Sequence, residues 1–423
     1  MKRLVLSVAL AAMPAFAQSQ SLKQFLESAD VHNVDRRLSL TQREAAAAQL
    51  TQAWSALLPS LSASGGWTHN QFEAVASLPT GMTVTRLVIV PADQLDAALR
   101  VDLPLIDAAR WFRGLAVASA SDAATEREAA ARDQVKRQVV GTYYALAAAQ
   151  ALVRSAQKSL GVSEAQLALQ TTRVKTGVVT ELDALRARAE VERTKQLVAD
   201  AKSLVATTGR SLRTVTGLEP AGDVSLPNDD LHAEADEASL ESQVSNLPAI
   251  RAAMKDIESA DRQAIASRLA LVPTVSAQFT ERFTNATGFQ GQSALYNFGV
   301  NFAWRLDGPT VVTPRIAEAQ KSASALTLER LSLAAKDQIF SDWQRIQASI
   351  IKVQATESQV EAAQRASALA KERYEAGVAT QIDVIQSERD VFSAEVSQIQ
   401  ARAELASARA SLRISAGQPV VTE

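Results

Sequence analysis

The sequence contains no cysteine, few aromatic residues and no long apolar run beyond its first residues. Zero cysteines in 423 residues exclude disulfides and thiolate metal sites. After the N-terminal run, no stretch supplies the roughly 18 uninterrupted apolar residues of a transmembrane helix. Aromatic residues make up only 5%, whereas Ala, Gln, Ser, Arg and Glu are abundant. This composition is typical of long helices with narrow packing seams.

The charge balance and the histidines exclude several functional classes. The formal net charge of −2 becomes −4 when Lys2 and Arg3 are left out, which argues against nucleic acid as a partner. His32, His69 and His232 are scattered without metal-ligand spacing, and no glycine-rich phosphate loop is present. We therefore predict no catalytic residue, no metal and no cofactor, and expect that the protein is not an enzyme.

Residues 1–17 have the pattern of a secretory signal peptide. Lys2 and Arg3 precede an apolar run from Leu4 to Ala12, and Ala15-Phe16-Ala17 is a small-x-small cleavage site. The run is too short to span a bilayer. The sequence therefore predicts an exported protein.

One motif occurs twice, 200 positions apart, at 173–183 and 373–383. Arg, Gly, Val, Thr and Asp recur at identical spacing in the two copies, which we call tip 1 (173–183) and tip 2 (373–383). Glycine just after a helix can adopt the left-handed conformation that ends it. Threonine followed three residues later by Asp resembles a capping box that starts the next helix. Each tip is therefore predicted to be the turn of a helical hairpin.

The duplication extends over most of the chain. Leu57-Leu58-Pro59-Ser60 and Leu271-Val272-Pro273-Thr274 begin matching strand regions, and the first copy has about 14 extra residues between Gly65 and Asp107. Each copy is predicted to run helix, strand, strand, long helix, tip, returning helix. The expected bounds are a first repeat over 18–217 (strands 59–70 and 97–106, helical hairpin 108–216), a connector over 218–248, and a second repeat over 249–423 (strands 273–284 and 294–306, helical hairpin 314–416).

The strand regions alternate apolar and polar residues with period 2. The clearest run places Tyr296, Phe298, Val300, Phe302, Trp304 and Leu306 on one face. A half-buried sheet in a soluble domain would show the same alternation, but aromatic residues at both ends of the apolar face are typical of a membrane barrel. Four strands cannot close a barrel, and an open edge is not tolerated in lipid. The membrane interpretation therefore requires oligomerisation, and three chains would contribute twelve strands.

The helical regions carry seams of alternating three- and four-residue steps. One seam runs from Val135 through Val139 and Leu146 to Leu160, and the second copy repeats it from Ile339 to Val360. The connector is rich in Pro, Gly and Asp, and its composition fits either a small ordered belt or a disordered linker.

The signal peptide, the duplicated plan, the two Leu-x-Pro-Ser/Thr strand beginnings and the doubled Arg-x-x-x-Gly-Val-x-Thr-x-x-Asp tips together resemble the TolC-like outer-membrane efflux factors. The resemblance covers essentially the whole chain after the signal peptide. It implies a mainly α-helical homotrimer, with a twelve-stranded β-barrel in outer-membrane lipid and a long periplasmic α-helical barrel. It also implies a periplasmic adaptor and an inner-membrane pump as partners.

The resemblance also suggests roles for individual tip residues. Adaptor hairpins would dock at Gly177, Val178 and Thr180 and at Gly377, Val378 and Thr380, although hairpin-turn chemistry alone explains the same residues. Asp183 and Asp383 would lie near the closed periplasmic end of the tunnel, or would only cap helices. Tyr374, Arg173 and Arg373 would brace a closed tip. Gln386 and Ala379 depart from the family pattern at an acidic ring and a gate arginine, so the gating details stay open.

Two functions follow as hypotheses. The first is a passive outer-membrane exit duct of a tripartite efflux or type I secretion system. The second is a soluble periplasmic coiled-coil adaptor or scaffold. Adaptors usually have one hairpin interrupting compact β domains, whereas this chain has two hairpins and little sequence for such domains, which favours the duct. The transported substrate is not encoded in these patterns.

Overall fold

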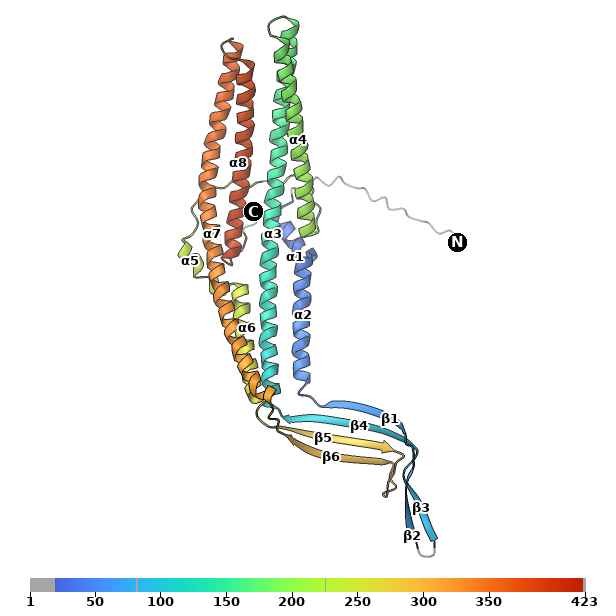
Figure 1. Cartoon of the computed structure of the whole chain (residues 1–423). Coiled ribbons are helices and arrows are strands. Elements are labelled where there is room, and N and C mark those ends of the chain that lie inside the picture. Colours follow the sequence, from blue (N-terminus) through green and yellow to red (C-terminus); the bar gives the residue numbers. More distant parts are fainter. Residues whose placement is uncertain (1–19, 81–82, 225, 421–423) are drawn as a thin grey trace, which may run out of the picture. The chain divides into compact units, whose positions relative to one another are not determined.

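The computed structural model describes residues 20–80, 83–224 and 226–420, which excludes the predicted signal peptide. The described elements are shown in Figure 1. In order they are α1 (Leu22–His32), α2 (Val34–Ser55), β1 (Ser60–His69), β2 (Ala74–Thr80), β3 (Thr83–Val90), β4 (Asp93–Ile106), α3 (Ala108–Lys175), α4 (Glu181–Thr216), α5 (Glu237–Glu241), the 3-10 helix η1 (Val244–Asn246), α6 (Pro248–Leu269), β5 (Thr274–Thr284), β6 (Ala294–Ala303), α7 (Gly308–Glu375) and α8 (Gln381–Ser415). None of the described helices has the length and apolar character needed to cross a membrane.

The chain divides into two compact units, and the long helices α3 and α7 run through both. Unit 1 comprises Met1–Leu40, Glu128–Leu247 and Ser332–Glu423, and unit 2 comprises Thr41–Arg127 and Pro248–Leu331. The predicted mainly α-helical fold with a β part is confirmed. Both α3 and α7 contain 68 residues.

The core of unit 1 forms where α1 packs against α3, α4 and α8. Phe25 is fully buried, and its ring lies 5.8 Å from that of Tyr143, edge to face. The predicted seam contributes Val139 and Leu146, both at most 1% exposed, and α8 contributes Ile414. In the second copy Ile339 and Ile346 are fully buried. The three-four spacing therefore does describe the packed faces of the long helices.

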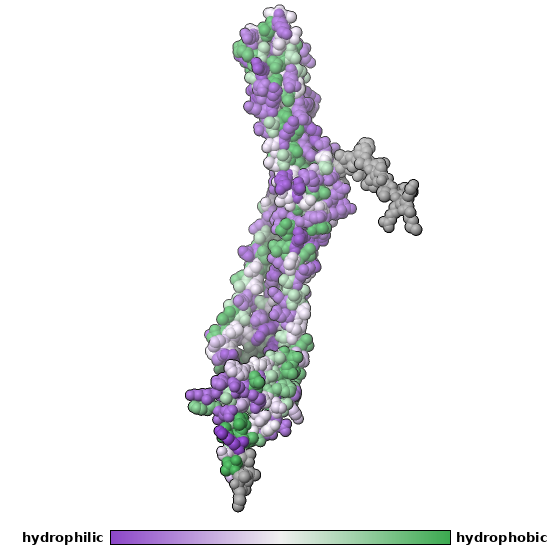
Figure 2. Space-filling model, turned by 90° about the vertical axis from the view of Figure 1, so that its right-hand side faces the viewer, coloured by the Kyte–Doolittle hydropathy of each residue, from purple (hydrophilic) through white to green (hydrophobic). Residues whose placement is uncertain are grey.

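Unit 2 contains a four-stranded antiparallel sheet of order β1-β4-β5-β6. The register aligns one face across all strands: Leu61 opposite Val101, Val101 opposite Phe279, and Phe279 opposite Phe298. On this face Phe298, Val300 and Phe302 are each at least 60% exposed. Figure 2 shows hydrophobic residues gathered on one side of the strand region.

The opposite face of the sheet is polar. Arg282 donates from Nη2 to Asp96 Oδ1 (2.6 Å) across β5 and β4, and Arg100 pairs with Asp102 along β4 (2.7 Å). Asn301 Nδ2 donates to Gln278 Oε1 (3.2 Å) from β6 to β5. One face of the sheet thus carries exposed apolar side chains, and the other carries paired charges and amides.

The structure differs from the sequence prediction around the strands. The segment from Phe72 to Gln94, which lies between the strands predicted over 59–70 and 97–106, contains the paired strands β2 and β3. Their apolar residues do not alternate cleanly with polar ones, and Pro79 interrupts β2, so the period-2 signal is weak. In consequence β4 begins at Asp93 rather than near 97.

β6 ends at Ala303, so Trp304 and Leu306, expected to be in the strand, lie beyond it. The next helix, α7, begins at Gly308 rather than 314 and includes Pro314. Asp307 explains this early start, because it accepts hydrogen bonds from Thr310 N (2.9 Å) and Thr310 Oγ1 (2.5 Å). These bonds and the nearby Arg305 guanidinium lower the pKa of Asp307 to about 2.

Candidate functional site at the helical tips

Both tips, which lie at one end of unit 1, have the turn geometry that the repeated glycine predicts (Figure 1). Gly177 and Gly377 have φ values of 74° and 76°. At tip 1 the Val178 N–H donates to Arg173 O (3.0 Å), and at tip 2 the Val378 N–H donates to Arg373 O (2.9 Å). This six-to-one bond around a left-handed glycine is the Schellman ending of a helix. Each tip therefore reverses the chain within a few residues.

The returning helices begin with the capping boxes that Thr and Asp predict. At tip 2 the Asp383 Oδ2 accepts from Thr380 N and from Thr380 Oγ1, both at 2.8 Å. At tip 1 the corresponding bonds from Thr180 to Asp183 are 3.3 and 2.9 Å. Bonds from the Thr380 backbone and hydroxyl, with the positive charge of Arg373, lower the pKa of Asp383. In this chain both aspartates therefore act as helix caps.

The outer surface of each tip is apolar and exposed. Val178 is 70% exposed and Val378 66%, and the next turn adds Leu182 and Ile382 at 53% and 51%. A Cβ placed on Gly177 or Gly377 would meet no atom within 4 Å. Each tip thus presents a small exposed apolar surface, and no described side chain lies against its glycine.

Tyr374 joins the two hairpins. Its hydroxyl donates to Gln170 Oε1 (3.0 Å), and the Arg173 guanidinium lies 5.2 Å from the centre of its ring. Gln170 is fully buried. The structure thus brings the predicted residues Tyr374 and Arg173 together, while Arg373 lies within electrostatic reach of Asp383.

A second connection between the hairpins follows further along α4 and α8. Arg389 donates from Nε and Nη2 to Glu190 Oε2 at 3.0 and 2.6 Å, and Arg193 holds the other oxygen, Oε1, at 2.5 Å. Burial raises the pKa of Glu190, but the hydrogen bonds from Arg193 and Arg389 outweigh it and leave the pKa below its usual value. Sequence reasoning missed this pair, although Arg389 interrupts the otherwise apolar seam of α8.

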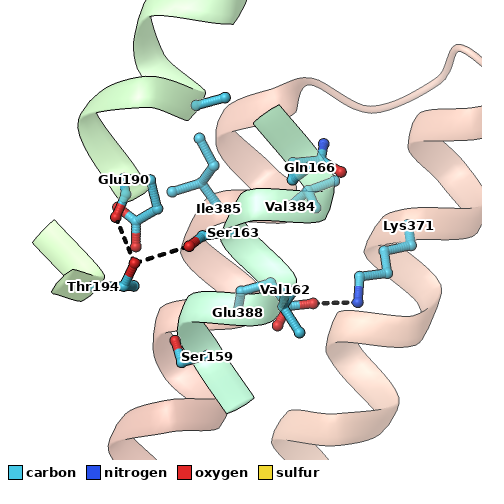
Figure 3. A pocket seen from close by; sticks show the side chains of 11 residues that line it. Ser159, Val162, Ser163, Gln166, Glu190, Thr194, Lys371, Val384, Ile385 and Glu388 are labelled. Atoms are coloured by element: carbon cyan, nitrogen blue, oxygen red, sulfur yellow. Dashed lines mark hydrogen bonds and ion pairs between the residues drawn. The ribbon is translucent and has the colours of Figure 1, made fainter. Parts of the chain in front are cut away.

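Between the two connections lies a small cavity of about 30 Å³, shown in Figure 3. Lys371 points to Glu388 there and forms an ion pair, and Ser163 Oγ shares a 2.8 Å hydrogen bond with Thr194 Oγ1. The cavity is large enough for a water molecule. Gln166, which lines it, has a buried Nε2 with no hydrogen-bond partner among the described residues.

The connector, which composition left open between belt and linker, contains α5 and η1 and is fastened to α8 in unit 1. Arg409 has a side chain only 9% exposed and donates to Asp229 from Nε (2.6 Å) and Nη2 (2.8 Å). Its Nη1 donates to Glu234 Oε1 (2.5 Å) and to His232 Nε2 (3.1 Å). Asp229, Asp230 and His232 offer ligand atoms close enough together for a metal ion, but Arg409 already occupies both Asp229 oxygens.

The sequence and fold of this chain match those of a known family of outer-membrane proteins. The family model for outer membrane efflux proteins matches residues 26–218 and 240–418. The chain therefore belongs to the outer membrane efflux protein family, and the predicted resemblance is confirmed.

Individual relatives agree with this placement. The chain is 23% identical over 394 residues to the probable efflux pump outer membrane protein TtgC of Pseudomonas putida, covering 90% of this chain and 79% of the relative. Its fold resembles the CmeC outer membrane channel of Campylobacter jejuni (TM-score 0.78, 19% identity, 94% and 85% of the two chains). It also resembles the outer membrane protein VceC of Vibrio cholerae (TM-score 0.77, 18% identity, 95% and 97%).

Family membership decides between the two functional hypotheses. The protein is an outer membrane efflux protein with a large periplasmic part, and the comparisons support the duct rather than the soluble adaptor or scaffold. The family is one of channels rather than enzymes.

Proposed function

We propose that three copies of this chain form a passive exit duct across the outer membrane, which receives substrate from an inner-membrane pump through a periplasmic adaptor. The pump would supply the energy. Its substrate preference would decide whether the duct serves efflux or type I secretion.

The observation that carries the trimer is the sheet of unit 2. Its apolar face suits lipid, and its polar face suits a water-filled lumen. The outer strands β1 and β6 each pair on one side only within the described residues. Since unpaired strand edges are not tolerated in lipid, β6 of one copy must pair with β1 of the next. Three copies would close a barrel of twelve strands.

The tips are the proposed docking surface for the adaptor. Val178 and Val378 are exposed apolar side chains on rigid turns, and the glycines beside them leave room for a close approach. A helical hairpin of the adaptor would pack its own small and apolar residues against Val178 and Val378. Thr180 and Thr380 are occupied by the capping boxes and would act by shaping the turn.

The connections between the hairpins are the proposed gate. Tyr374 and Arg173 hold tip 2 to α3 while the periplasmic end is closed, and these contacts must break if the hairpins separate. In a trimer, three Asp383 carboxylates near one axis would attract cations even while they cap α8.

Membrane fractionation, gel analysis without heating and planar-bilayer recording test the duct. The protein should sediment with outer membranes, run as a trimer and form pores. Recovery as a soluble periplasmic monomer would contradict the proposal and restore the scaffold hypothesis.

Site-specific cross-linking tests the docking surface separately. The chain has no cysteine, so Val178→Cys or Val378→Cys introduces the only thiol. A thiol-reactive cross-linker should capture the adaptor at either tip. Lys202→Cys, an exposed position on α4 away from the tip, should capture none.

A further inference from the structure

Among the described residues, the β2–β3 hairpin has no counterpart in the second repeat and is not part of the four-stranded sheet. It forms a separate two-stranded sheet, and residues 74–90 contain a single charged residue, Arg86. Val84 is 70% exposed and Val88 40%. A two-stranded ribbon is at best marginally stable alone, and an uncharged strand edge invites pairing with another chain. The hairpin therefore needs a covering surface.

The hairpin continues the edge of the main sheet. After β1, the Asn70 N–H donates to Ala92 O (2.7 Å) and Asn70 Nδ2 donates to Pro91 O (3.1 Å). These bonds carry the β1–β4 pairing up to the base of the hairpin. β2 therefore extends the line of β1, and β3 extends the line of β4.

On the β3 side, the base of the hairpin contacts the chain's own loop 285–293, which lies between β5 and β6 and also bonds to β4. Asn285 Oδ1 accepts from Leu95 N (2.7 Å), and Asn285 Nδ2 donates to Asp93 O (2.8 Å). Beyond it, the Gly288 N–H donates to Ile89 O on β3 (3.3 Å). Within the described residues, β2 pairs with β3 alone, so its other edge is open.

The closed barrel determines what lies beside that open edge, and this step rests on the proposed trimer. If β6 of a neighbouring copy pairs with β1, the loop 285–293 that precedes that β6 comes to lie beside β2. The two edges of one copy carry matching exposed aromatic residues. Phe72, between β1 and β2, is 78% exposed, and Phe289, in the loop, is 69% exposed.

We propose that the β2–β3 hairpin docks on loop 285–293 of the neighbouring copy, with Phe72 and Phe289 in contact across the interface. The contact is heterologous, because different surfaces of the same chain meet, and heterologous contacts form a ring when the rotation between copies closes, as it would in the proposed trimer. Each hairpin is then held between its own loop on the β3 side and a neighbour's loop on the β2 side. We call this proposed contact between the β2–β3 hairpin and the neighbouring loop 285–293 the clasp. Three such contacts would link the copies at the extracellular rim of the trimer.

Mixed-chain disulfide cross-linking tests the clasp, because the wild-type chain has no cysteine. Two differently tagged chains, Phe72→Cys and Phe289→Cys, are co-expressed and oxidised. The expected product is a disulfide-linked dimer that carries both tags, and the double variant should give covalent trimers. Ile89→Cys combined with Phe289→Cys is the matched control, and it should form its bond within one chain, since the Ile89 carbonyl accepts a hydrogen bond from Gly288 of the chain's own loop.

Three outcomes would overturn the clasp. If trimers assemble but no dimer with both tags forms, the hairpin is covered by something else, such as lipid. A disulfide between two Phe72→Cys chains would mean that the hairpins of different copies contact one another. A bond only within single chains of the double variant would mean that Phe72 reaches its own loop. The absence of trimers in the unmodified protein would instead refute the proposed duct, and the clasp with it.

A thermal measurement gives an independent readout. Phe72→Ala and Phe289→Ala should each lower the temperature at which the trimer dissociates, and the double variant should lower it no further than the larger single effect. Phe72→Leu and Phe289→Leu, which keep an apolar side chain at each position, are the matched controls and should lower it less. Additive losses from the two phenylalanine variants would contradict a shared contact.

Discussion

The two tips share a backbone and an apolar outer surface, and they differ in the contacts that join the two hairpins. Their glycines have φ values within 2° of each other, and both use a capping box of Thr and Asp. Yet Tyr374, which fastens tip 2, corresponds to Val174 at tip 1, and its acceptor Gln170 corresponds to Ala370. The residues that shape the turn are the same at both tips. The residues that join the two hairpins, Tyr374 and Gln170, have no equivalents at the corresponding positions.

The largest effect is expected where the tips are alike. Gly177→Val or Gly377→Val places a β-branched residue at positive φ, a strain of about 1–2 kcal/mol that distorts the turn. Transport should fall at least tenfold for either variant while trimers still reach the membrane, measured by substrate accumulation and by gels of unheated membranes. Gly→Asn at the same positions is the control, since Asn tolerates this conformation. Normal transport in both Val variants would refute docking at the tips.

A smaller effect is expected at the Glu190–Arg389 pair, which has no counterpart at Ala189 and Asp390. Arg389 is 44% exposed, so breaking the pair with Arg389→Gln should cost about 1–2 kcal/mol rather than the full value for a buried pair. A double-mutant cycle with Glu190→Gln, followed by chemical denaturation, measures the coupling. Independent, additive effects would mean that the pair does not join the hairpins.

The same pair predicts a pH dependence. The pKa of Glu190 lies below its ordinary value of 4.5 in the folded protein, so its contribution to stability is present above pH 4.5 and is lost as pH falls through the folded pKa. The free energy of unfolding should therefore decrease on acidification below about pH 4.5, and Glu190→Gln should flatten part of that decrease. An unchanged acid profile in the variant would contradict the shift.

The Tyr374 hydroxyl makes a hydrogen bond at tip 2 that Val174 cannot make at tip 1. Tyr374→Phe removes the hydrogen bond to Gln170 but keeps the ring beneath Arg173, at a cost of about 1 kcal/mol. If this bond helps to hold the gate closed, the variant should open more often in planar-bilayer recordings. Val174→Ala at the equivalent position should not change the opening frequency. Equal effects at both positions would mean that the bond has no special role in closure.

The smallest effect is expected at the aspartates. Asp383→Asn should reduce the cation preference of the pore, measured as a reversal potential in a salt gradient, because three charges are removed from the trimer. Asp183→Asn tests whether tip 1 lies equally near the axis. If neither variant changes the reversal potential, the aspartates act only as caps.

The tips were largely predictable from sequence because their geometry is local. A left-handed glycine and a Thr-x-x-Asp box determine a turn within about ten residues, and both signals occur at the same spacing in two places. The connections between hairpins were not predictable in this way. Tyr374 and Gln170 are 204 positions apart, and no periodic pattern links a tyrosine on one helix to a glutamine on another.

The strands show the same limit. β6 was predictable from its alternating aromatic residues, but β2 and β3 were not, since both faces of their ribbon carry apolar residues and Pro79 interrupts the run. Their placement also involves contacts between residues far apart in the sequence, such as that of Gly288 with Ile89. Apolar and polar residues alternate along a strand only when its two faces lie in different environments. A strand with similar side chains on both faces therefore has no such signal.

Arg409 links the connector to a late step of synthesis. It lies on α8, the last helix of the chain, whereas Asp229 and Glu234 emerge from the ribosome some 180 residues earlier. Without α8 these carboxylates would lack their counter-charge, while Gln150 on α3 and Trp343 on α7 would still bond to the connector backbone. A chain truncated before Arg409 should therefore keep the connector attached but leave two largely buried acidic groups without a partner charge.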